Sequence, residues 1–300
     1  MRIRSAAGLR GTSAPMSWLI VGTIPRDDFP LYEGRCLLEE GGLRLDAQLV
    51  PVGRGTPALL AAACIASQAL DVEPPLALLA GDTGRGKGSI RVYEHLCRAL
   101  PVISPDVIVF HYLQPDVDWH NRVFLHLEEL ARRPVLVADA GFMYVAKMSG
   151  FAACYDLFTP DVGELAFLAD EKAPHPFYTR GFILQEEDRA PELIQRAYRH
   201  ENASSYLLVK GRCDVVASSQ GILERICEPV VEAMEPIGGT GDTLTALAGA
   251  FIAARYPIAQ ACSLAAKANR VMGLLARPTP ASTIADLLRS LPAALEAVLR

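Results

Sequence analysis

A glycine string near the C-terminal end of the chain carries the residue types that hold an anion beside a base. The string reads Gly238, Gly239, Thr240, Gly241, Asp242 and precedes an alanine-rich segment that predicts a helix. Glycines let backbone N–H groups turn toward a ligand, and a helix start adds free donors and a positive dipole end. Asp242 would repel a phosphate directly in front of it, so we interpret it as a base that takes a proton from a hydroxyl. The alternative is that Asp242 only caps the helix.

A second glycine-rich loop, Gly81–Lys87, follows an apolar run and fits the pattern G-x-x-x-x-G-K of a phosphate loop. Gly88, however, stands where a Ser or Thr hydroxyl should bind Mg²⁺, and such loops usually follow the first strand of a domain. A P-loop NTPase therefore stays an alternative. The loop instead predicts part of a substrate pocket, in which Arg85, Lys87 and Arg91 attract an anionic substrate. An ordinary glycine turn before a helix would explain the same residues.

Two polar residues end apolar runs that predict parallel strands. His111 and Asp139 close such runs, and the carboxyl ends of parallel strands face the ligand crevice in open α/β sheets. We therefore expect both near the substrate, with a core histidine and a helix cap as the alternatives. The nearby Asp116, Asp118 and His120 are predicted to be solvated rather than to bind a metal.

The elements that must position these residues follow an alternating pattern. From residue 56 onward, short apolar runs alternate with longer segments of helical periodicity. Continuous apolar runs suit strands covered by helices on both faces. The fold class predicted is α/β, with a doubly wound, mostly parallel central sheet. The expected strands are Trp18–Gly22, Leu76–Ala80, Val107–His111, Val135–Asp139, Asp156–Phe158, Ser205–Lys210 and Asp214–Ala217.

The remaining segments are a flap, the C-terminal helices and an N-terminal leader, and they set the limits of the domain. Residues 34–52 alternate around Gly41-Gly42, which predicts a hairpin or a small β flap that could cover a ligand, or an edge hairpin without that role. Helices are expected over 241–276, broken at Pro257, and after Thr283, a plausible N-cap. We expect 16–300 to form one α/β domain. Residues 1–15 are expected to be an unstructured leader, which leaves open whether Met1 or Met16 is the start.

Composition excludes several classes of protein. The 300 residues carry 34 acidic and 29 basic side chains and are 51% hydrophobic, which fits neither a disordered chain nor a collagen. A mildly acidic chain without a basic stripe predicts no nucleic-acid partner, and no apolar run is long enough for a membrane span. The seven cysteines form no C-x-x-C pair, so we expect reduced thiols in a cytoplasmic protein.

The string at 238–242 resembles the G-x-G-D string of the ribokinase-like superfamily. Residues 159–165 resemble that superfamily's T-P-x-x-x-E segment, whose acid, here Glu164, helps to organise phosphate and Mg²⁺. Lys210-Gly211 is similar to the K-G before its paired strands. The resemblance implies ATP or ADP and Mg²⁺ as cofactors. The residues it assigns to the nucleotide are Thr159, Glu164, Lys210, Gly211, Gly238 and Asn269, with Glu164 also an indirect Mg²⁺ organiser.

The resemblance is weaker on the substrate side. Residues 53–58 resemble the G-G-x-x-x-N region but lack its Asn, and residues 81–84 loosely resemble the G-x-D-x-x-G element of sugar kinases. The substrate candidates are therefore Gly53, Gly55, Asp82, His111 and Asp139.

Two branches of the superfamily compete. The exact string 239–242 with Gly238 before it resembles the NAD(P)H-hydrate dehydratases, but their G-P-G-L-G string is absent and residues 111–115 read His-Tyr-Leu-Gln-Pro. Our leading hypothesis is an ATP-dependent kinase that phosphorylates a hydroxyl of a small metabolite. This substrate could itself be phosphorylated or anionic. The dehydratase is the alternative, and a nucleotide-sensing protein without catalysis is a third. A homodimer is compatible with all three.

Overall fold

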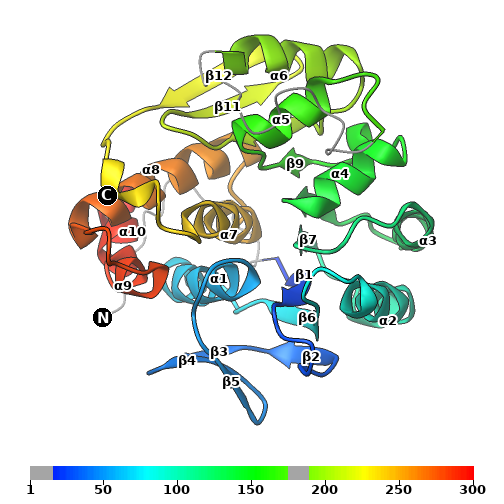
Figure 1. The fold of residues 1–300 in the computed structure, drawn as a ribbon, viewed down its shortest axis with the longest axis horizontal. Coiled ribbons are helices and arrows are strands. Elements are labelled where there is room, and N and C mark those ends of the chain that lie inside the picture. The colour runs from blue at the N-terminus through cyan, green and yellow to red at the C-terminus, as the bar shows by residue number, and fades with distance from the viewer. Residues whose placement is uncertain (1–15, 175–188) are drawn as a thin grey trace.

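The computed structural model describes residues 16–174 and 189–300 (Figure 1). The predicted leader 1–15 lies outside this range. Residues 175–188 also lie outside it.

A nine-stranded sheet forms the centre, in the order β12-β11-β10-β9-β8-β7-β1-β6-β2. The six strands from β10 to β6 run parallel, which confirms the mostly parallel sheet. Antiparallel strands extend it at both ends, β11 and β12 at one and β2 at the other. The strand bounds are β1 Trp18–Ile24, β2 Tyr32–Arg35, β6 Leu76–Gly81, β7 Val107–His111, β8 Val135–Ala138, β9 Leu157–Phe158, β10 Tyr206–Val209, β11 Asp214–Ser218 and β12 Gly221–Ile226.

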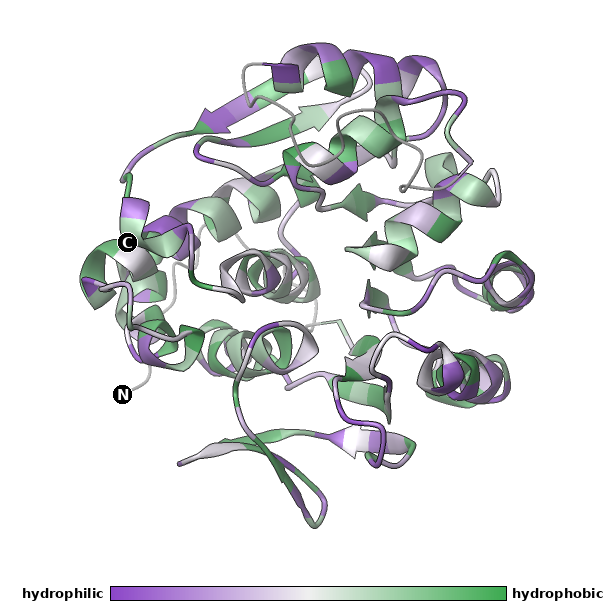
Figure 2. Cartoon of the chain, viewed as in Figure 1, coloured by the Kyte–Doolittle hydropathy of each residue, from purple (hydrophilic) through white to green (hydrophobic). Residues whose placement is uncertain are grey.

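Helices cover both faces of this sheet (Figure 1). One face packs against α1 (Thr56–Leu70), α7 (Thr240–Ala253), α8 (Ile258–Ala276), α9 (Ile284–Leu288) and α10 (Leu291–Leu299). The other packs against α2 (Lys87–Ile103), α3 (Val117–Glu128), α4 (Gly141–Met148), α5 (Val162–Ala169) and α6 (Ala190–Arg199). In Figure 2 hydrophobic residues dominate α1 between its neighbours, whereas α6 at the rim carries many hydrophilic ones.

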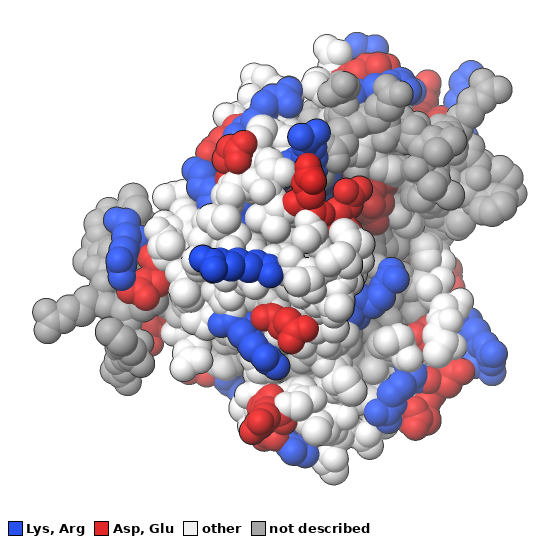
Figure 3. Space-filling view, turned by 60° about the vertical axis from the view of Figure 1, so that its left-hand side comes forward, with Lys and Arg blue, Asp and Glu red and all other residues white. Residues whose placement is uncertain are grey.

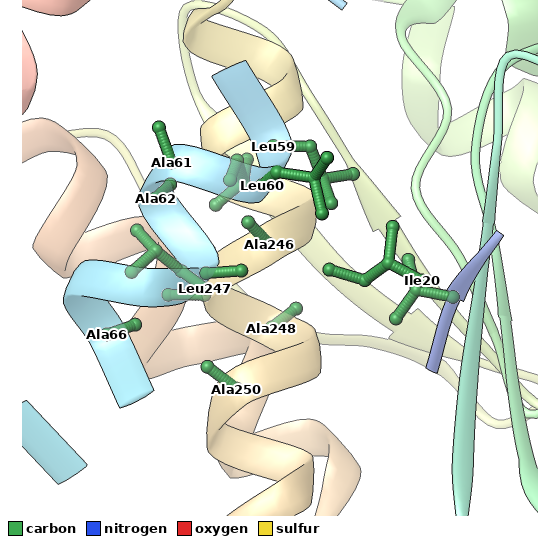
Figure 4. Close-up of a cluster of buried hydrophobic side chains, with 14 of the residues drawn as sticks. Ile20, Leu59, Leu60, Ala61, Ala62, Ala66, Ala246, Leu247, Ala248 and Ala250 are labelled. Atoms are coloured by element: carbon green, nitrogen blue, oxygen red, sulfur yellow. The ribbon is translucent and has the colours of Figure 1, made fainter. Parts of the chain in front are cut away.

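The central strand shows why the sequence folds this way. Every residue of β1 is buried, and because successive side chains alternate across a strand, Ile20 packs into one core while Leu19 and Val21 pack into the other. On the Ile20 side, the alanines of α1 and α7 let the two helices pack closely side by side (Figure 4). This packing holds the first turns of α1 and α7 together, and both turns carry site residues.

A small antiparallel sheet of β3 (Leu37–Glu39), β4 (Gly42–Leu45) and β5 (Gln48–Val50) lies outside the main sheet. Its first turn uses Gly41 and Gly42, both at positive φ, which confirms the hairpin predicted there. Figure 1 shows the sheet projecting from the rest of the protein next to β2. Whether it closes over a ligand stays a prediction.

Three features differ from the sequence-based expectations. Strand β12 was not expected because its charged Glu224 and Arg225 break the apolar pattern, which an exposed sheet edge permits. Two short helices, α9 and α10, replace the single C-terminal helix, although Thr283 is the predicted N-cap. The expectation of reduced thiols is wrong for Cys213 and Cys227. They form a disulfide because the β11–β12 hairpin brings its two ends together.

The surface carries both signs of charge. Figure 3 shows lysine and arginine interspersed with aspartate and glutamate on one face. Among the described residues, none of the helices has the length and apolarity that a membrane crossing requires.

Candidate active site

The carboxyl ends of the parallel strands bring four charged or polar groups together. His111 ends β7, Asp139 follows β8 and Lys210 follows β10, while Asp242 enters from the first turn of α7. These side chains are separated by up to 131 residues in sequence and are joined by hydrogen bonds. Such a crevice at strand ends is where open α/β sheets bind ligands.

Asp242 is a largely buried carboxylate that accepts a hydrogen bond on each oxygen. The Gly55 N–H donates to Oδ2 at 2.6 Å, and His111 Nε2 lies 3.0 Å from Oδ1. Burial raises the pKa of Asp242, but the hydrogen bond and charge of His111, together with Lys210 and Gly55, lower it below its ordinary value. Asp242 is therefore ionised at neutral pH, as a base must be before it accepts a proton.

His111 is fully buried and bridges two elements. Its Nδ1 lies 3.0 Å from the Thr56 hydroxyl at the start of α1, while Nε2 faces Asp242. Gly22 of β1 makes room for this arrangement, because a Cβ there would lie 2.7 Å from the His111 carbonyl and 2.9 Å from Thr56 Cγ2. His111 is thus a buried histidine that also contacts Asp242, and its role at the substrate stays a prediction.

The second carboxylate, Asp139, belongs to an ion pair. Lys210 Nζ lies 2.8 and 2.9 Å from its two oxygens, and the Thr245 hydroxyl donates to Oδ2 at 2.6 Å. His111, Asp139 and Asp242 place ligand atoms within 4.8 Å of one another, a spacing that a metal ion could use. The Lys210 ammonium already supplies the cation at Asp139, and a metal there would be repelled.

Replacing His111 with Gln should move the acid limb of the pH–rate profile to higher pH. The variant removes the hydrogen bond and charge that lower the pKa of Asp242, while burial continues to raise it. The base would then stay protonated over more of the acid range. The measurements are kcat/KM against pH and the ¹³C carboxyl NMR titration of Asp242. His126→Gln, on the exposed last turn of α3, is the control. An unchanged Asp242 titration would contradict the assignment.

The glycine string forms the start of α7 as predicted. Gly239 is the N-cap, with φ at +112°, a conformation that side chains rarely adopt. A Cβ on Gly239 would also lie 2.9 Å from Ile284 Cγ1. Gly241 faces the Lys210 stem, where a Cβ would lie 3.4 Å from Cδ. The helix start is thus open to an approaching anion and lies beside a lysine, whereas the catalytic roles of Gly239, Thr240 and Gly241 stay predictions.

A cavity of about 820 Å³ lies beside Gly241 and Lys210, which form part of its lining. The β10–β11 turn, the segment 229–235 and the starts of α5 and α7 form its walls. A cavity of this volume is large enough to hold a nucleotide. It is lined by Asp161, Val162, Lys210, Gly211, Arg212, Asp214, Pro229, Val230, Val231, Glu232, Met234, Glu235, Thr240, Gly241, Leu244, Asn269 and Arg270.

The other predicted nucleotide residues occupy different positions. Lys210, Gly211 and Asn269 line the cavity. Asn269 is also bonded to α7, because its Oδ1 accepts from the Thr243 hydroxyl at 2.7 Å and its Nδ2 donates to the Thr240 carbonyl at 3.1 Å.

Thr159, Glu164 and Gly238 lie around this cavity rather than on its lining. Thr159 is fully buried and bonded to Thr245, 2.9 Å away. Glu164 accepts from Tyr144 OH and from the Asp161 N–H in a capping box. Burial and Asp161 raise the pKa of Glu164 to about 8, although Lys210 lowers it. Glu164 is therefore mostly protonated at neutral pH.

The loop Gly81–Lys87 closes on its own carboxylate. The N–H groups of Gly84, Arg85 and Gly86 donate to Asp82 Oδ1, and the Ser89 N–H and hydroxyl donate to Oδ2, at 2.9 to 3.0 Å. A phosphate loop needs these amides free for phosphate. The P-loop alternative is therefore wrong. Asp82 directly follows β6, but both of its carboxylate oxygens accept hydrogen bonds from the loop itself and from Ser89.

The substrate candidates Gly53 and Gly55 also differ from each other. Gly55 touches Asp242 directly, whereas Gly53 is exposed and its N–H bonds the Pro51 carbonyl. The prediction that His120 is solvated is wrong, because its side chain is fully buried and its Nε2 lies 2.9 Å from Tyr155 OH in the core. Burial lowers the pKa of His120 to about 4, so it is neutral.

Sequence reasoning missed several residues of the site. Thr56 and Thr245 face inward from helices, where single threonines carry no signal. Arg270 was missed although it is buried, because α8 reads as an ordinary small-residue helix. Tyr112 follows His111 at a positive φ of 51°, a conformation that no sequence pattern indicates.

Comparisons with known proteins identify a family and two relatives. Residues 114–292 match the carbohydrate-kinase family model, which is described as NAD(P)H-hydrate dehydratase. An uncharacterized protein of Methanocaldococcus jannaschii, MJ1337, is 41% identical over 221 residues, 73% of this chain and 90% of that protein. The bifunctional NAD(P)H-hydrate repair enzyme Nnr of Hyperthermus butylicus is 35% identical over 109 residues, 36% of this chain but only 19% of that enzyme.

Solved structures share the fold at low sequence identity. A ribokinase-like superfamily protein of Enterococcus faecalis aligns with a TM-score of 0.57 at 15% identity, covering 99% of this chain and 92% of that one. The ADP complex of Bacillus subtilis pyridoxal kinase aligns with a TM-score of 0.53 at 16% identity, covering 84% of this chain and 89% of that one. Phosphofructokinase-2 of Escherichia coli in complex with fructose-6-phosphate aligns with a TM-score of 0.54 at 13% identity, covering 93% of this chain and 99% of that one.

Proposed function

Because this chain belongs to the carbohydrate-kinase family described as NAD(P)H-hydrate dehydratase, within the ribokinase-like superfamily, we propose that it transfers a phosphoryl group from a nucleotide to a hydroxyl of a small metabolite. One observation carries the proposal. An ionised, buried carboxylate, Asp242, lies in the same helical turn as the open glycine start of α7. A base and an anion site in one turn are what phosphoryl transfer to a hydroxyl requires.

The transfer uses the two sides of Asp242. The nucleotide occupies the cavity beside Lys210 and Gly241, so that its terminal phosphate meets the start of α7. The acceptor hydroxyl approaches from the side of Gly55 and His111 and gives its proton to Asp242 as its oxygen bonds to phosphorus. The bond between phosphorus and the nucleotide's bridging oxygen breaks, and ADP or AMP leaves. Lys210 and the helix dipole balance the charge on the phosphoryl oxygens.

The residues predicted to organise Mg²⁺ do not fit a direct ligand. Both oxygens of Glu164 accept hydrogen bonds, from Tyr144 and Asp161, and its raised pKa of about 8 keeps it mostly protonated. Mg²⁺ prefers ionised carboxylates and phosphate oxygens. No step of the proposed transfer passes through a metal, and an indirect role for Glu164 stays a prediction.

A turnover screen tests the proposal. Protein is incubated with ATP, or with ADP, and a mixture of hydroxylated metabolites, and mass spectrometry follows phosphorylated products and nucleotide release. We expect one acceptor to gain a phosphoryl group in step with nucleotide consumption. Asp242→Asn protein purified in parallel controls for contaminating kinases. Nucleotide binding by calorimetry without turnover of any acceptor would favour the sensing alternative.

The family match favours a second candidate, the NAD(P)H-hydrate dehydratase. Its chemistry begins with the same transfer, because a phosphorylated hydroxyl is a better leaving group than hydroxide. The C–O bond then breaks as inorganic phosphate leaves, and the neighbouring ring carbon gives up a proton, which restores the C=C double bond.

Hydrated NADH distinguishes the two candidates. If the chain is a dehydratase, adding ATP or ADP should restore the absorbance of the reduced nicotinamide and release inorganic phosphate. A stable phosphoester on another metabolite, without return of that absorbance, would decide for the kinase.

A further inference from the structure

Arg54 is a cation placed against the glycine string. It comes directly before Gly55, whose N–H holds Asp242. The aliphatic stem of Arg54 lies on Gly238, where an added Cβ would be 3.3 Å from Arg54 Cβ and 3.5 Å from Cδ. The residue is exposed, and within residues 16–174 and 189–300 it forms no ion pair with a carboxylate. An arginine charge is therefore available at the entrance to the site.

Tyr112 lies beside the side chain of Arg54. The two are close enough for Arg54 to lower the pKa of the Tyr112 hydroxyl, against the larger effect of burial. The backbone of Tyr112 has a positive φ of 51°, and the Thr23 hydroxyl bonds its carbonyl at 2.6 Å. Its ring packs edge-on against His111, with centroids 4.6 Å apart, and is 41% exposed. Strained backbone of this kind persists where surrounding contacts enforce it and gathers at functional sites.

The same surroundings carry negative charge. Burial and the charges of Asp242 and Asp139 raise the pKa of Tyr112, and the neighbouring Arg54 opposes them. An anion entering next to Asp242 would be repelled by that carboxylate unless a cation met it there. Arginine suits this task because its planar fork binds phosphate and carboxylate oxygens bidentately.

We propose that Arg54, which lies against Gly238 and next to Gly55, binds a phosphate or carboxylate group on the acceptor side of Asp242. The proposal rests on the proposed function and names its substrate class, a small molecule with an oxyanion near its reacting hydroxyl. The same guanidinium could instead hold the phosphoryl group in transit, because both are oxyanions next to Gly238. Arg54 is then a specificity residue in the first case and a catalytic one in the second.

Inorganic phosphate, titrated calorimetrically into protein saturated with ADP, tests this assignment. We expect Arg54→Gln to weaken phosphate binding by about tenfold or more, the equivalent of roughly one charge-assisted hydrogen bond. Tyr112→Phe should weaken phosphate binding a few-fold, because it removes the hydroxyl beside the guanidinium of Arg54. Arg98→Gln, on exposed α2, is the control and should bind phosphate like the wild type. Equal phosphate affinity in wild-type and Arg54→Gln protein, or no binding by the wild type, would overturn the proposal.

A second titration with a non-hydrolysable ATP analogue separates the two sources. If Arg54-dependent phosphate binding persists, the oxyanion belongs to the acceptor. If it disappears, the analogue's terminal phosphate occupies the Arg54 site and the group in transit is bound there. Protein that fails to bind any nucleotide would count against the proposed function, whereas the Arg54 comparison can still be made on the free protein.

Discussion

Asp242→Asn is expected to lower kcat by about 10²–10⁴-fold, the usual contribution of a general base. Asparagine has nearly the same shape and keeps an oxygen for the Gly55 N–H, so the start of α7 should not move. It cannot accept the acceptor's proton. Nucleotide affinity should stay within a few-fold, because the nucleotide cavity is lined by Gly241 and Lys210 rather than by Asp242.

The measurements for this variant are steady-state turnover and nucleotide binding by calorimetry. Asp71→Asn is a matched control, because Asp71 caps α1 in a left-handed conformation that asparagine accepts. Circular dichroism of both variants checks the fold. Turnover within tenfold of the wild type would mean that another group takes the proton.

Arg270→Met should destabilise the protein by about 3–5 kcal/mol, because it leaves a buried partner without its cation. Arg270 Nε donates to Asp214 Oδ2 at 2.8 Å, and both side chains are at most 10% exposed. Its remaining donors reach the carbonyls of Gly211, Arg212, Cys227 and Pro229. These bonds join the β10–β11 turn to the segment after β12, which form two walls of the nucleotide cavity. Nucleotide affinity should fall as well.

Urea unfolding under non-reducing conditions measures the loss. Lys267→Met on the same helix is the control. Its partly exposed pair with Glu224 should contribute at most about 1 kcal/mol. A loss no larger than that of Lys267→Met would show that the Arg270 network does not hold these walls.

The loss in Arg270→Met should also depend on pH. Burial raises the pKa of Asp214 although Arg270 lowers it, so removing Arg270 raises this pKa further. A carboxyl with a raised pKa in the folded state binds its proton more tightly there than in the unfolded chain. Stability is therefore retained at low pH and lost as pH rises through the folded pKa. The destabilisation should be largest at neutral pH and shrink toward acid.

The kinase and dehydratase candidates share the half of the protein that the sequence describes best. Both use a nucleotide cavity, the start of α7 and Asp242. They differ in what the acceptor side binds and whether the phosphorylated product eliminates. That side is built from Arg54, Gly55 and residues 111–115, which match the superfamily patterns least. The oxyanion site proposed at Arg54 therefore bears on the part of the function that the family does not specify.

The sequence by itself determined the local structure. Continuous apolar runs predicted the parallel strands to within about two residues at each end, because burial on both faces requires them. The glycine string predicted a helix from residue 241, and α7 begins one residue earlier, at Thr240, after Gly239 in a conformation that side chains rarely adopt. Charged edge strand β12 was missed because an exposed edge needs no apolar pattern.

Only the tertiary structure decided which of these groups meet. His111 and Asp242 are 131 residues apart, and Cys213 and Cys227 pair because a hairpin closes between them. The glycine loop after β6 matched a phosphate-loop pattern, yet its amides bind the loop's own Asp82. The physical reason is common to all three. Periodicity and turn chemistry act over a few residues. Ion pairs, disulfides and the hydrogen bonds from loop amides to a carboxylate depend on how strand ends converge in space.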